Sequence, residues 1–329
     1  MITFRQLGVC EQICRICDSI GFKNATKIQA QTIPYALNNR DILGYAQTGS
    51  GKTLAFIIPI LQALLKHKSA FSCLTIVPAR ELAFQIASQF ELLGSVFGIK
   101  IALLVGGMEN TSQIAILNRS PHILICTPGR LVDHIGKTKS LSLKNIKNLV
   151  FDEADRLFQT DFDKEFLIIL ASVPRSKQCF LFSATMTTKV EKLEQISMVN
   201  PIKIQVNKKY KIVVTLKQNY IFVPFRFKDC YLAYVCNEFT NSSVIIFVDT
   251  QSCAEKIALL LKILNFKASC LHGKLDQSKR MEILYKFKLG QIKILVATDL
   301  VSRGIDIPGI DLIVNYDIPL YTKDYIHRV

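Results

Sequence analysis

The chain has 329 residues, half of them apolar, and a formal net charge of +15 at pH 7. Its length suits two hydrophobic cores better than one, and its apolar content excludes a disordered chain, so a globular protein of two domains is expected. The longest apolar run, Leu54 to Leu65, is shorter than the roughly 18 residues of a membrane span, and no secretion signal opens the chain, so an intracellular protein without membrane contact is expected.

The positive charge is the first indication of a partner. A field of this sign attracts polyanions such as nucleic acid, and plain solubility is the alternative. Charge alone does not decide between them.

Three cysteines lie close together near the N-terminus, at Cys10, Cys14 and Cys17. Their spacing matches the buried face of an amphipathic helix. The alternative is a metal site, but no second Cys or His pair follows at the spacing of a zinc site. The cysteines are therefore expected to be reduced thiols in the core.

The first half contains short apolar runs separated by segments of helix length. A run at 41–45 is followed by others at 73–77, 122–126, 148–152 and 179–183. Continuous rather than alternating apolarity predicts strands that are covered on both faces, and the spacing is typical of βαβ crossovers. A parallel sheet with helices on both sides is expected.

The second half repeats this rhythm after an interruption. The lysine-rich stretch from Ile204 to Tyr220 has no helical period, which predicts a linker and an edge strand. A second α/β domain of the same type should follow. Its strands are predicted at 244–248, 267–271, 293–297 and 312–316. The predicted division is a first domain at 1–206, a linker at 207–217 and a second domain at 218–329.

A phosphate-binding loop is predicted between the strand at 41–45 and the apolar helix that begins near residue 54. The glycines let backbone N–H groups approach phosphate oxygens, Lys52 can reach the β and γ phosphates, and Thr53 can hold Mg²⁺. The strict pattern has glycine where this chain has Ala46. The loop consists of Ala46, Gln47, Thr48, Gly49, Ser50, Gly51, Lys52 and Thr53.

Acidic residues end the strand predicted at 148–152. A magnesium-nucleotide site needs a carboxylate at such a place, so Asp152 is predicted to hold Mg²⁺ through water and Glu153 to activate the attacking water. The alternative is an acidic cap on the helix that runs through Asp155 and Arg156. Beside a phosphate loop, the nucleotide site is the favoured interpretation.

Residues 152–155 spell DEAD, and together with AQTGSGKT they make the chain resemble the DEAD-box ATP-dependent RNA helicases. The resemblance covers essentially the whole chain. It implies two RecA-like domains, ATP and Mg²⁺ as cofactors, and RNA as the partner. A DNA translocase with the same loop is a rival, but GFKNATKIQ at 21–29 and the full DEAD sequence favour the RNA helicases.

The stretch GFKNATKIQ resembles the family's adenine-recognition block. The resemblance implies that Phe22 stacks on the base, that Gln29 bonds its edge and that Thr26 belongs to the same site. A planar amide can bond adenine bidentately, because the base offers a donor and an acceptor side by side. Phe4 matches the isolated upstream aromatic, and Ala25 replaces the usual proline.

Further blocks resemble the family's RNA-binding and coupling motifs. Their glycines and arginines suit contact with the sugar-phosphate backbone. The implied RNA-binding residues of the first domain are Pro78, Arg80, Gly106, Gly107, Thr127, Pro128 and Arg130. Ser183 and Thr185 match the coupling motif SAT and are counted with the catalytic residues.

The second half matches the family's later blocks in order. Gln277, Arg280 and Thr298 are implied to lie along RNA, whereas Arg303 and Asp306 are implied to face the nucleotide, with Asp306 near the ribose. The wording of several blocks is closest to a nucleolar subgroup that processes precursor ribosomal RNA. A nuclear and nucleolar monomer that works with ribosome-assembly factors is therefore expected.

The chain ends on YTKDYIHRV, which resembles the start of the family's arginine-finger motif. His327 and Arg328 are present, and Arg328 is counted with the catalytic residues, whereas two later arginines would fall beyond Val329. Such fingers contribute roughly 10³ to 10⁵ in rate in other phosphoryl-transfer enzymes. If the chain is complete, the resemblance implies an ATPase-deficient RNA-binding scaffold with a destabilised second domain, which is the alternative function.

Overall fold

The computed structural model describes residues 2–46, 49–157, 163–206, 216–299, 307 and 309–328. The chain folds into two compact units, Met1–Lys209 (unit 1) and Tyr210–Val329 (unit 2). Among the described residues, none of the helices combines the length and the apolarity that a membrane span requires.

Unit 1 is built on a seven-stranded sheet in the order β3-β4-β2-β5-β6-β1-β7. Each pair of neighbouring strands is parallel. The carboxyl ends of all these strands therefore meet at one edge, which we call the carboxyl edge. The strands are β1 (Ile42–Tyr45), β2 (Cys73–Ile76), β3 (Ile101–Leu104), β4 (Ile123–Cys126), β5 (Asn148–Phe151), β6 (Gln178–Ser183) and β7 (Ile202–Gln205).

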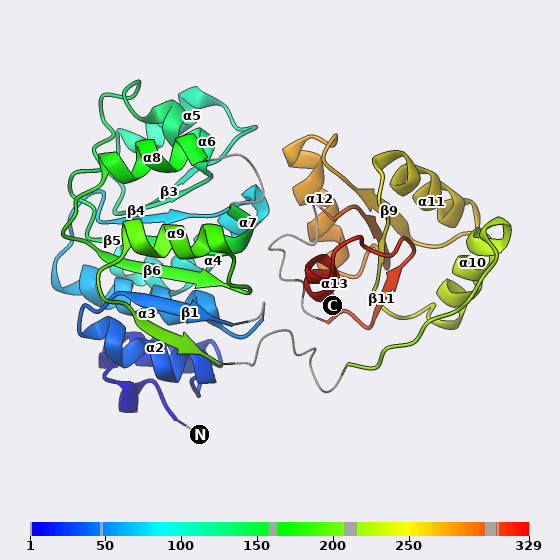
Figure 1. The fold of residues 1–329 in the computed structure, drawn as a ribbon, viewed down its shortest axis with the longest axis horizontal. Helices are drawn as coiled ribbons and strands as arrows, with labels where there is room; N and C mark the ends of the chain where they lie inside the picture. Colours follow the sequence, from blue (N-terminus) through cyan, green and yellow to red (C-terminus); the bar gives the residue numbers. More distant parts are fainter. Residues whose placement is uncertain are drawn as a thin grey trace. The chain divides into compact units, whose positions relative to one another are not determined.

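Helices cover both faces of this sheet (Figure 1). Successive strand residues enter opposite cores: Ile42 belongs to the core that contains Phe56 and Ile86, and Leu43 belongs to the core that contains Leu131 and Phe166. Alternation between two cores is what a doubly covered sheet requires. The helices are α1 (Glu11–Ser19), α2 (Lys27–Leu37), α3 (Lys52–Lys66), α4 (Arg80–Gly94), α5 (Asn110–Leu117), α6 (Pro128–His134), α7 (Ala154–Leu157), α8 (Asp163–Ser172) and α9 (Thr188–Ser197), with 3-10 turns at Arg5–Leu7 and Ser95–Phe97.

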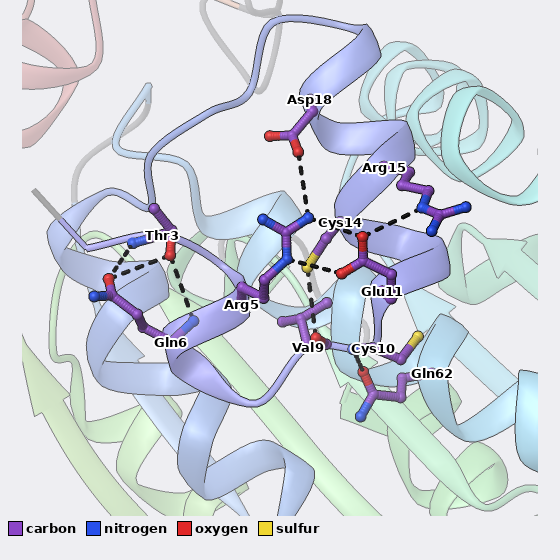
Figure 2. A network of polar contacts seen from close by, with 10 residues as sticks. All are labelled: Thr3, Arg5, Gln6, Val9, Cys10, Glu11, Cys14, Arg15, Asp18 and Gln62. Carbon is purple, nitrogen blue, oxygen red and sulfur yellow. Dashed lines mark hydrogen bonds and ion pairs between the residues drawn. The ribbon is translucent and has the colours of Figure 1, made fainter.

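The N-terminal segment is fastened to α3 (Figure 2). The Gln62 side chain accepts a hydrogen bond from the Cys10 backbone N–H at 2.8 Å and donates one to the Gly8 carbonyl at 3.2 Å. As predicted, Cys14 and Cys17 lie on the buried face of α1. The prediction of core thiols is wrong for Cys10, which precedes the helix and is half-buried, and for Cys230 of unit 2, which is exposed. Burial raises the pKa of the Cys17 thiol to about 12, so this thiol stays protonated.

Unit 2 contains a four-stranded sheet in the order β11-β8-β10-β9, again with parallel pairs. One hydrophobic cluster covers each face, so the unit has two cores like unit 1. Its strands are β8 (Val244–Phe247), β9 (Ala268–Leu271), β10 (Ile294–Ala297) and β11 (Leu312–Asn315), and its helices are α10 (Lys228–Glu238), α11 (Gln251–Ile263), α12 (Gln277–Lys288) and α13 (Thr322–Arg328), with a 3-10 turn at Phe225–Phe227.

Every apolar run predicted to be a strand forms one, and the prediction of two parallel sheets with helices on both faces is confirmed. Of the stretch 204–220, for which a linker and an edge strand are predicted, residues 204–205 are the end of the edge strand β7 (Ile202–Gln205), and residues 216–220 form no strand. Most of the predicted linker, residues 207–215, lies outside the described residues.

Candidate active site

The predicted nucleotide residues of unit 1 follow three neighbouring strands. The sheet order places β5, β6 and β1 side by side. Asp152 follows β5, Ser183 ends β6, and the phosphate loop follows β1. Because parallel strands end at the same edge, three segments that are distant in sequence converge at the carboxyl edge.

The described part of the phosphate loop has the backbone of an anion site. Gly49 and Gly51 adopt positive φ angles of 76° and 91°, and Gly51 is the N-cap of α3. A helix N-terminus presents free N–H groups and the positive end of its dipole. Gln47 and Thr48 lie outside the described residues. Ala46 is buried directly after β1, Ser50 lies between the two glycines, and Thr53 is in the first turn of α3.

Lys52 is the first residue of α3 and is almost fully buried, with 7% of its surface exposed. Its Nζ is buried and has no hydrogen-bond partner among the described residues. A buried ammonium group without a partner is costly, unless an anion completes it. The side chain therefore fits the phosphate contact that the sequence predicts.

The predicted adenine residue Gln29 is tied directly to the phosphate loop. Its Oε1 accepts from the Thr26 N–H at 2.8 Å, and its Nε2 donates to the Gly51 carbonyl at 3.0 Å. Thr26 is the N-cap of α2 and forms a reciprocal capping box with Gln29. The Gln29 amide keeps one free acceptor position on Oε1 and one free N–H on Nε2, and an adenine edge offers the complementary donor and acceptor. Phe22 is 40% exposed, so its ring is open to stacking.

Asp152 and Glu153 are buried carboxyl groups, with 3% and 6% of their surface exposed. Burial raises the pKa of both carboxyl groups, although the nearby Lys52 opposes this rise. Glu153 also pairs with Arg156 at 3.3 Å. Its φ angle of 51° is unusual for a residue with a side chain. Strain of this kind is typical of functional sites.

A contact that the sequence did not predict joins the DEAD segment to the SAT motif. Asp155 Oδ2 accepts from the Thr185 N–H at 3.0 Å and from the Thr185 hydroxyl at 2.6 Å. The Ser183 hydroxyl donates to the Thr185 carbonyl at 2.7 Å. The signal available in the sequence was that both segments end predicted strands, and β5 and β6 prove to be neighbours.

The predicted RNA-binding blocks of unit 1 also meet at the carboxyl edge. An alanine Cβ at Gly106 would lie 2.9 Å from Arg80 Nη2, and one at Gly107 would lie 3.1 Å from Arg80 Cζ. The Arg130 Nη2 donates to the Met108 carbonyl at 3.2 Å. Two arginines from separate blocks therefore lie against one glycine loop. Pro78 precedes α4, Thr127 is the N-cap of α6, and Pro128 is its first residue.

In unit 2 the described candidates lie beyond β9 and β10. Gln277 and Arg280 are in the first turn of α12, and both are largely buried. Thr298 follows β10 and is 8% exposed. Arg303 and Asp306 lie outside the described residues.

Arg328, which the resemblance places among the catalytic residues, is bound to residues of its own unit. Its side chain is fully buried in unit 2, where Nε and Nη2 donate to the two oxygens of Asp299 at 2.5 and 2.7 Å. Nη1 donates to Asn315 Oδ1 at 3.0 Å and to the Asp317 carbonyl at 2.7 Å. These contacts use four of the five N–H groups of the guanidinium and hold neighbouring strand ends together, and the catalytic role of Arg328 stays a prediction.

Comparisons with known proteins agree with this geometry. Residues 26–193 match the DEAD/DEAH box helicase model, and residues 228–329 match the helicase conserved C-terminal domain. The human protein named "Probable ATP-dependent RNA helicase DDX47" is 51% identical over 99% of this chain and 72% of its own length. The "ATP-dependent rRNA helicase rrp3" of Schizosaccharomyces pombe is 49% identical over 99% of this chain and 70% of its own length.

A solved structure shows the same fold. "S. cerevisiae Dbp5 bound to RNA and ADP BeF3" superposes with a TM-score of 0.89 at 29% identity, covering all of this chain and 85% of that one. The prediction of two RecA-like domains is thereby confirmed. The chain belongs to the DEAD/DEAH box helicase family.

Proposed function

We propose that this protein is an ATP-dependent RNA helicase that hydrolyses ATP to ADP and phosphate and separates short RNA duplexes during ribosomal RNA processing. The observation that carries the proposal is the convergence of the buried Lys52, which follows β1, with the buried Asp152 and Glu153, which follow β5, at one edge of the sheet. Relatives that are 49–51% identical over nearly the whole chain are named RNA or rRNA helicases, which supports both the reaction and the substrate.

The nucleotide site assigns a separate task to each residue. Lys52 binds the β and γ phosphates with its buried ammonium group. Thr53 and Asp152 are the residues that would hold Mg²⁺, which neutralises charge on the phosphates when bound. Glu153 accepts the proton of the attacking water, and its raised pKa makes it a stronger base.

Adenine recognition depends on the same loop. Phe22 stacks on the base, and the remaining donor and acceptor of Gln29 bond its edge. Gln29 also donates a hydrogen bond to the Gly51 carbonyl, so the residue that binds the base is directly connected to the loop that binds the phosphates. Asp306, near the ribose, is proposed on resemblance alone.

RNA binding is proposed to follow the sugar-phosphate backbone. Arg80 and Arg130 supply charge at the glycine loop, while Thr298 and the first turn of α12 supply contacts from unit 2. Such contacts are independent of base sequence and weaken as salt rises. The Asp155 to Thr185 bond is the proposed link between the nucleotide site and the SAT segment.

The cellular setting is proposed from the relatives' names. An enzyme of ribosomal RNA processing would act in the nucleus and nucleolus, as a monomer, together with ribosome-assembly factors. The alternative of an ATPase-deficient RNA-binding scaffold is not favoured, since the helicase relatives match 99% of the chain.

A comparison of two duplexes tests the proposed function. The protein should unwind a short RNA duplex in the presence of ATP and leave a DNA duplex of the same sequence intact, because the family resemblance implies recognition of the RNA 2′-OH. Strand separation is measured by the fluorescence of a quenched, labelled strand. Equal activity on both duplexes would exclude an RNA-specific helicase and favour a general translocase.

A further inference from the structure

Gln113 is a fully buried polar side chain at the carboxyl edge of unit 1. It lies on α5, and its Nε2 donates to the carbonyls of Val105 at 3.0 Å and Met108 at 3.4 Å. These two carbonyls flank Gly106 and Gly107. One amide group therefore holds both ends of residues 105–108, which we call the glycine loop.

His134 completes the bonding of this amide. Its Nε2 lies 3.2 Å from Gln113 Oε1, and its Nδ1 lies 2.9 Å from Thr138 Oγ1. Because both N–H bonds of Gln113 go to carbonyls, its oxygen must accept, so the neutral His134 ring carries its hydrogen on Nε2. Nδ1 then accepts from the Thr138 hydroxyl. Burial lowers the pKa of His134, so the neutral form prevails at neutral pH.

The same loop receives both arginines of the predicted RNA-binding surface. Arg80 lies where a side chain at Gly106 or Gly107 would be. Arg130 donates to the Met108 carbonyl and to the Asn110 side chain. Arg130 and His134 are four residues apart on α6, so both project from one face of the helix. Three blocks that are separate in sequence thus form one hydrogen-bonded assembly.

We propose that Gln113 and His134 are positioning residues for RNA binding: they fix the glycine loop so that Arg80 and Arg130 are held ready for the phosphates. The inference rests on the proposed RNA-binding function of this edge. Neither residue would touch RNA itself, since both are buried. Fixing the loop in advance removes the entropic cost of ordering it when RNA binds.

The chain offers a matched control at the opposite edge of the same sheet. Gln178 is the first residue of β6, and its Nε2 donates to the carbonyls of Ala36 at 2.8 Å and Arg40 at 2.9 Å. Its Oε1 accepts from Asn148 Nδ2 at 3.0 Å. This network copies the bonding of Gln113 but lies at the amino ends of the strands, away from the predicted RNA residues.

The experiment compares Gln113→Leu, His134→Leu and Gln178→Leu. Binding of a fluorescent oligouridylate is measured by anisotropy at fixed salt, with nucleotide affinity from a fluorescent ADP analogue and stability from thermal unfolding. Gln113→Leu and His134→Leu should each weaken RNA binding about tenfold, the effect of about 1.4 kcal/mol, and leave nucleotide affinity unchanged. The double variant should be no weaker than either single one, because both break the same network.

Gln178→Leu should lower the melting temperature by a similar amount yet keep RNA affinity within about twofold. His134→Gln should restore most of the RNA affinity, since its amide N–H can replace the Nε2 donor. If Gln113→Leu does not fold, Gln113→Met gives the same test, because its unbranched side chain is close to glutamine in length and has no N–H donor.

Two results would overturn the inference while leaving the proposed function intact. The first is that the parent protein binds RNA and that Gln113→Leu folds and binds RNA equally well. The other is a Gln178→Leu that loses as much RNA affinity as Gln113→Leu, since general destabilisation would then explain both. A parent that fails to bind RNA would instead refute the proposed function, and the inference with it.

Discussion

Gly51→Ala should damage unit 1 in two separable ways. The residue has a φ angle of 91°, which only glycine adopts without cost. An added Cβ would also lie 2.5 Å from Gln29 Nε2 and 2.9 Å from Thr26 Oγ1. The substitution therefore strains the backbone and pushes the adenine residue out of place.

The structure gives the size of both effects. A left-handed conformation costs an ordinary residue roughly 1–2 kcal/mol. Loss of the hydrogen bond from Gln29 to the Gly51 carbonyl adds about 1 kcal/mol. Gly51→Ala should thus lower the free energy of unfolding of unit 1 by about 2–3 kcal/mol.

Gly49→Ala is the matched control, because Gly49 has a φ angle of 76° but no heavy atom of the described residues within 4 Å of the added Cβ. It should carry only the backbone cost. Urea unfolding measures the difference, and the affinity ratio for fluorescent ADP over GDP measures the adenine contact. Gly51→Ala should lose adenine preference about fivefold more than Gly49→Ala. Equal stability and equal preference in the two variants would refute the proposed link between Gln29 and the loop.

Three further predictions concern buried polar groups. Glu153→Gln should stop ATP hydrolysis but raise the melting temperature at neutral pH. Burial raises the pKa of Glu153 above its usual value of 4.5, so the folded state favours the protonated carboxyl group. The resulting stabilisation is complete below pH 4.5 and is lost as the pH rises through the raised pKa. Melting curves between pH 4 and 8 should show the gap between variant and parent closing at the acid end. Thr185→Val removes the hydroxyl bond to Asp155, keeps the bond from the backbone N–H, and should reduce RNA unwinding more than ATP hydrolysis. Equal losses in the two assays would argue against coupling. Arg328→Met should destabilise unit 2 by about 3–5 kcal/mol, and adding Asp299→Asn should recover part of that loss if the buried pair is the cause.

Most strands could be predicted from the sequence because they are buried on both faces. The runs that became β2, β4, β5 and β10 are buried along their whole length, so their apolarity is continuous. The edge strand β3 was missed, since only alternate residues of it are buried and the run is short. Continuous apolarity thus identifies central strands and misses an edge strand whose burial alternates, although the edge strands β9 and β11 of unit 2 were predicted.

The residues of the site could be predicted where the residue type itself determines the chemistry. They could not be predicted where a residue's role depends on contacts with residues distant in the sequence. The composition of the phosphate loop and of the DEAD segment singled out Lys52 and Asp152. The partners of Arg328 and the contact from Gln29 to Gly51 join residues 11 to 29 positions apart, and no periodicity encodes them. The order of the strands in the sheet shows which of the segments that follow the strands lie next to one another.

The buried charges of the nucleotide site lead to a last prediction. Without ligand, the Lys52 ammonium has no hydrogen-bond partner among the described residues, and burial raises the pKa of Asp152 and Glu153. Nucleotide phosphates would supply the missing anion, so saturating MgATP should stabilise the protein by about 2.7 kcal/mol at a hundred times Kd. Lys52→Met should abolish this stabilisation in a thermal shift assay, whereas Lys66→Met, at the far end of the same helix, should leave it unchanged. An undiminished shift in Lys52→Met would show that the buried ammonium is not the phosphate contact.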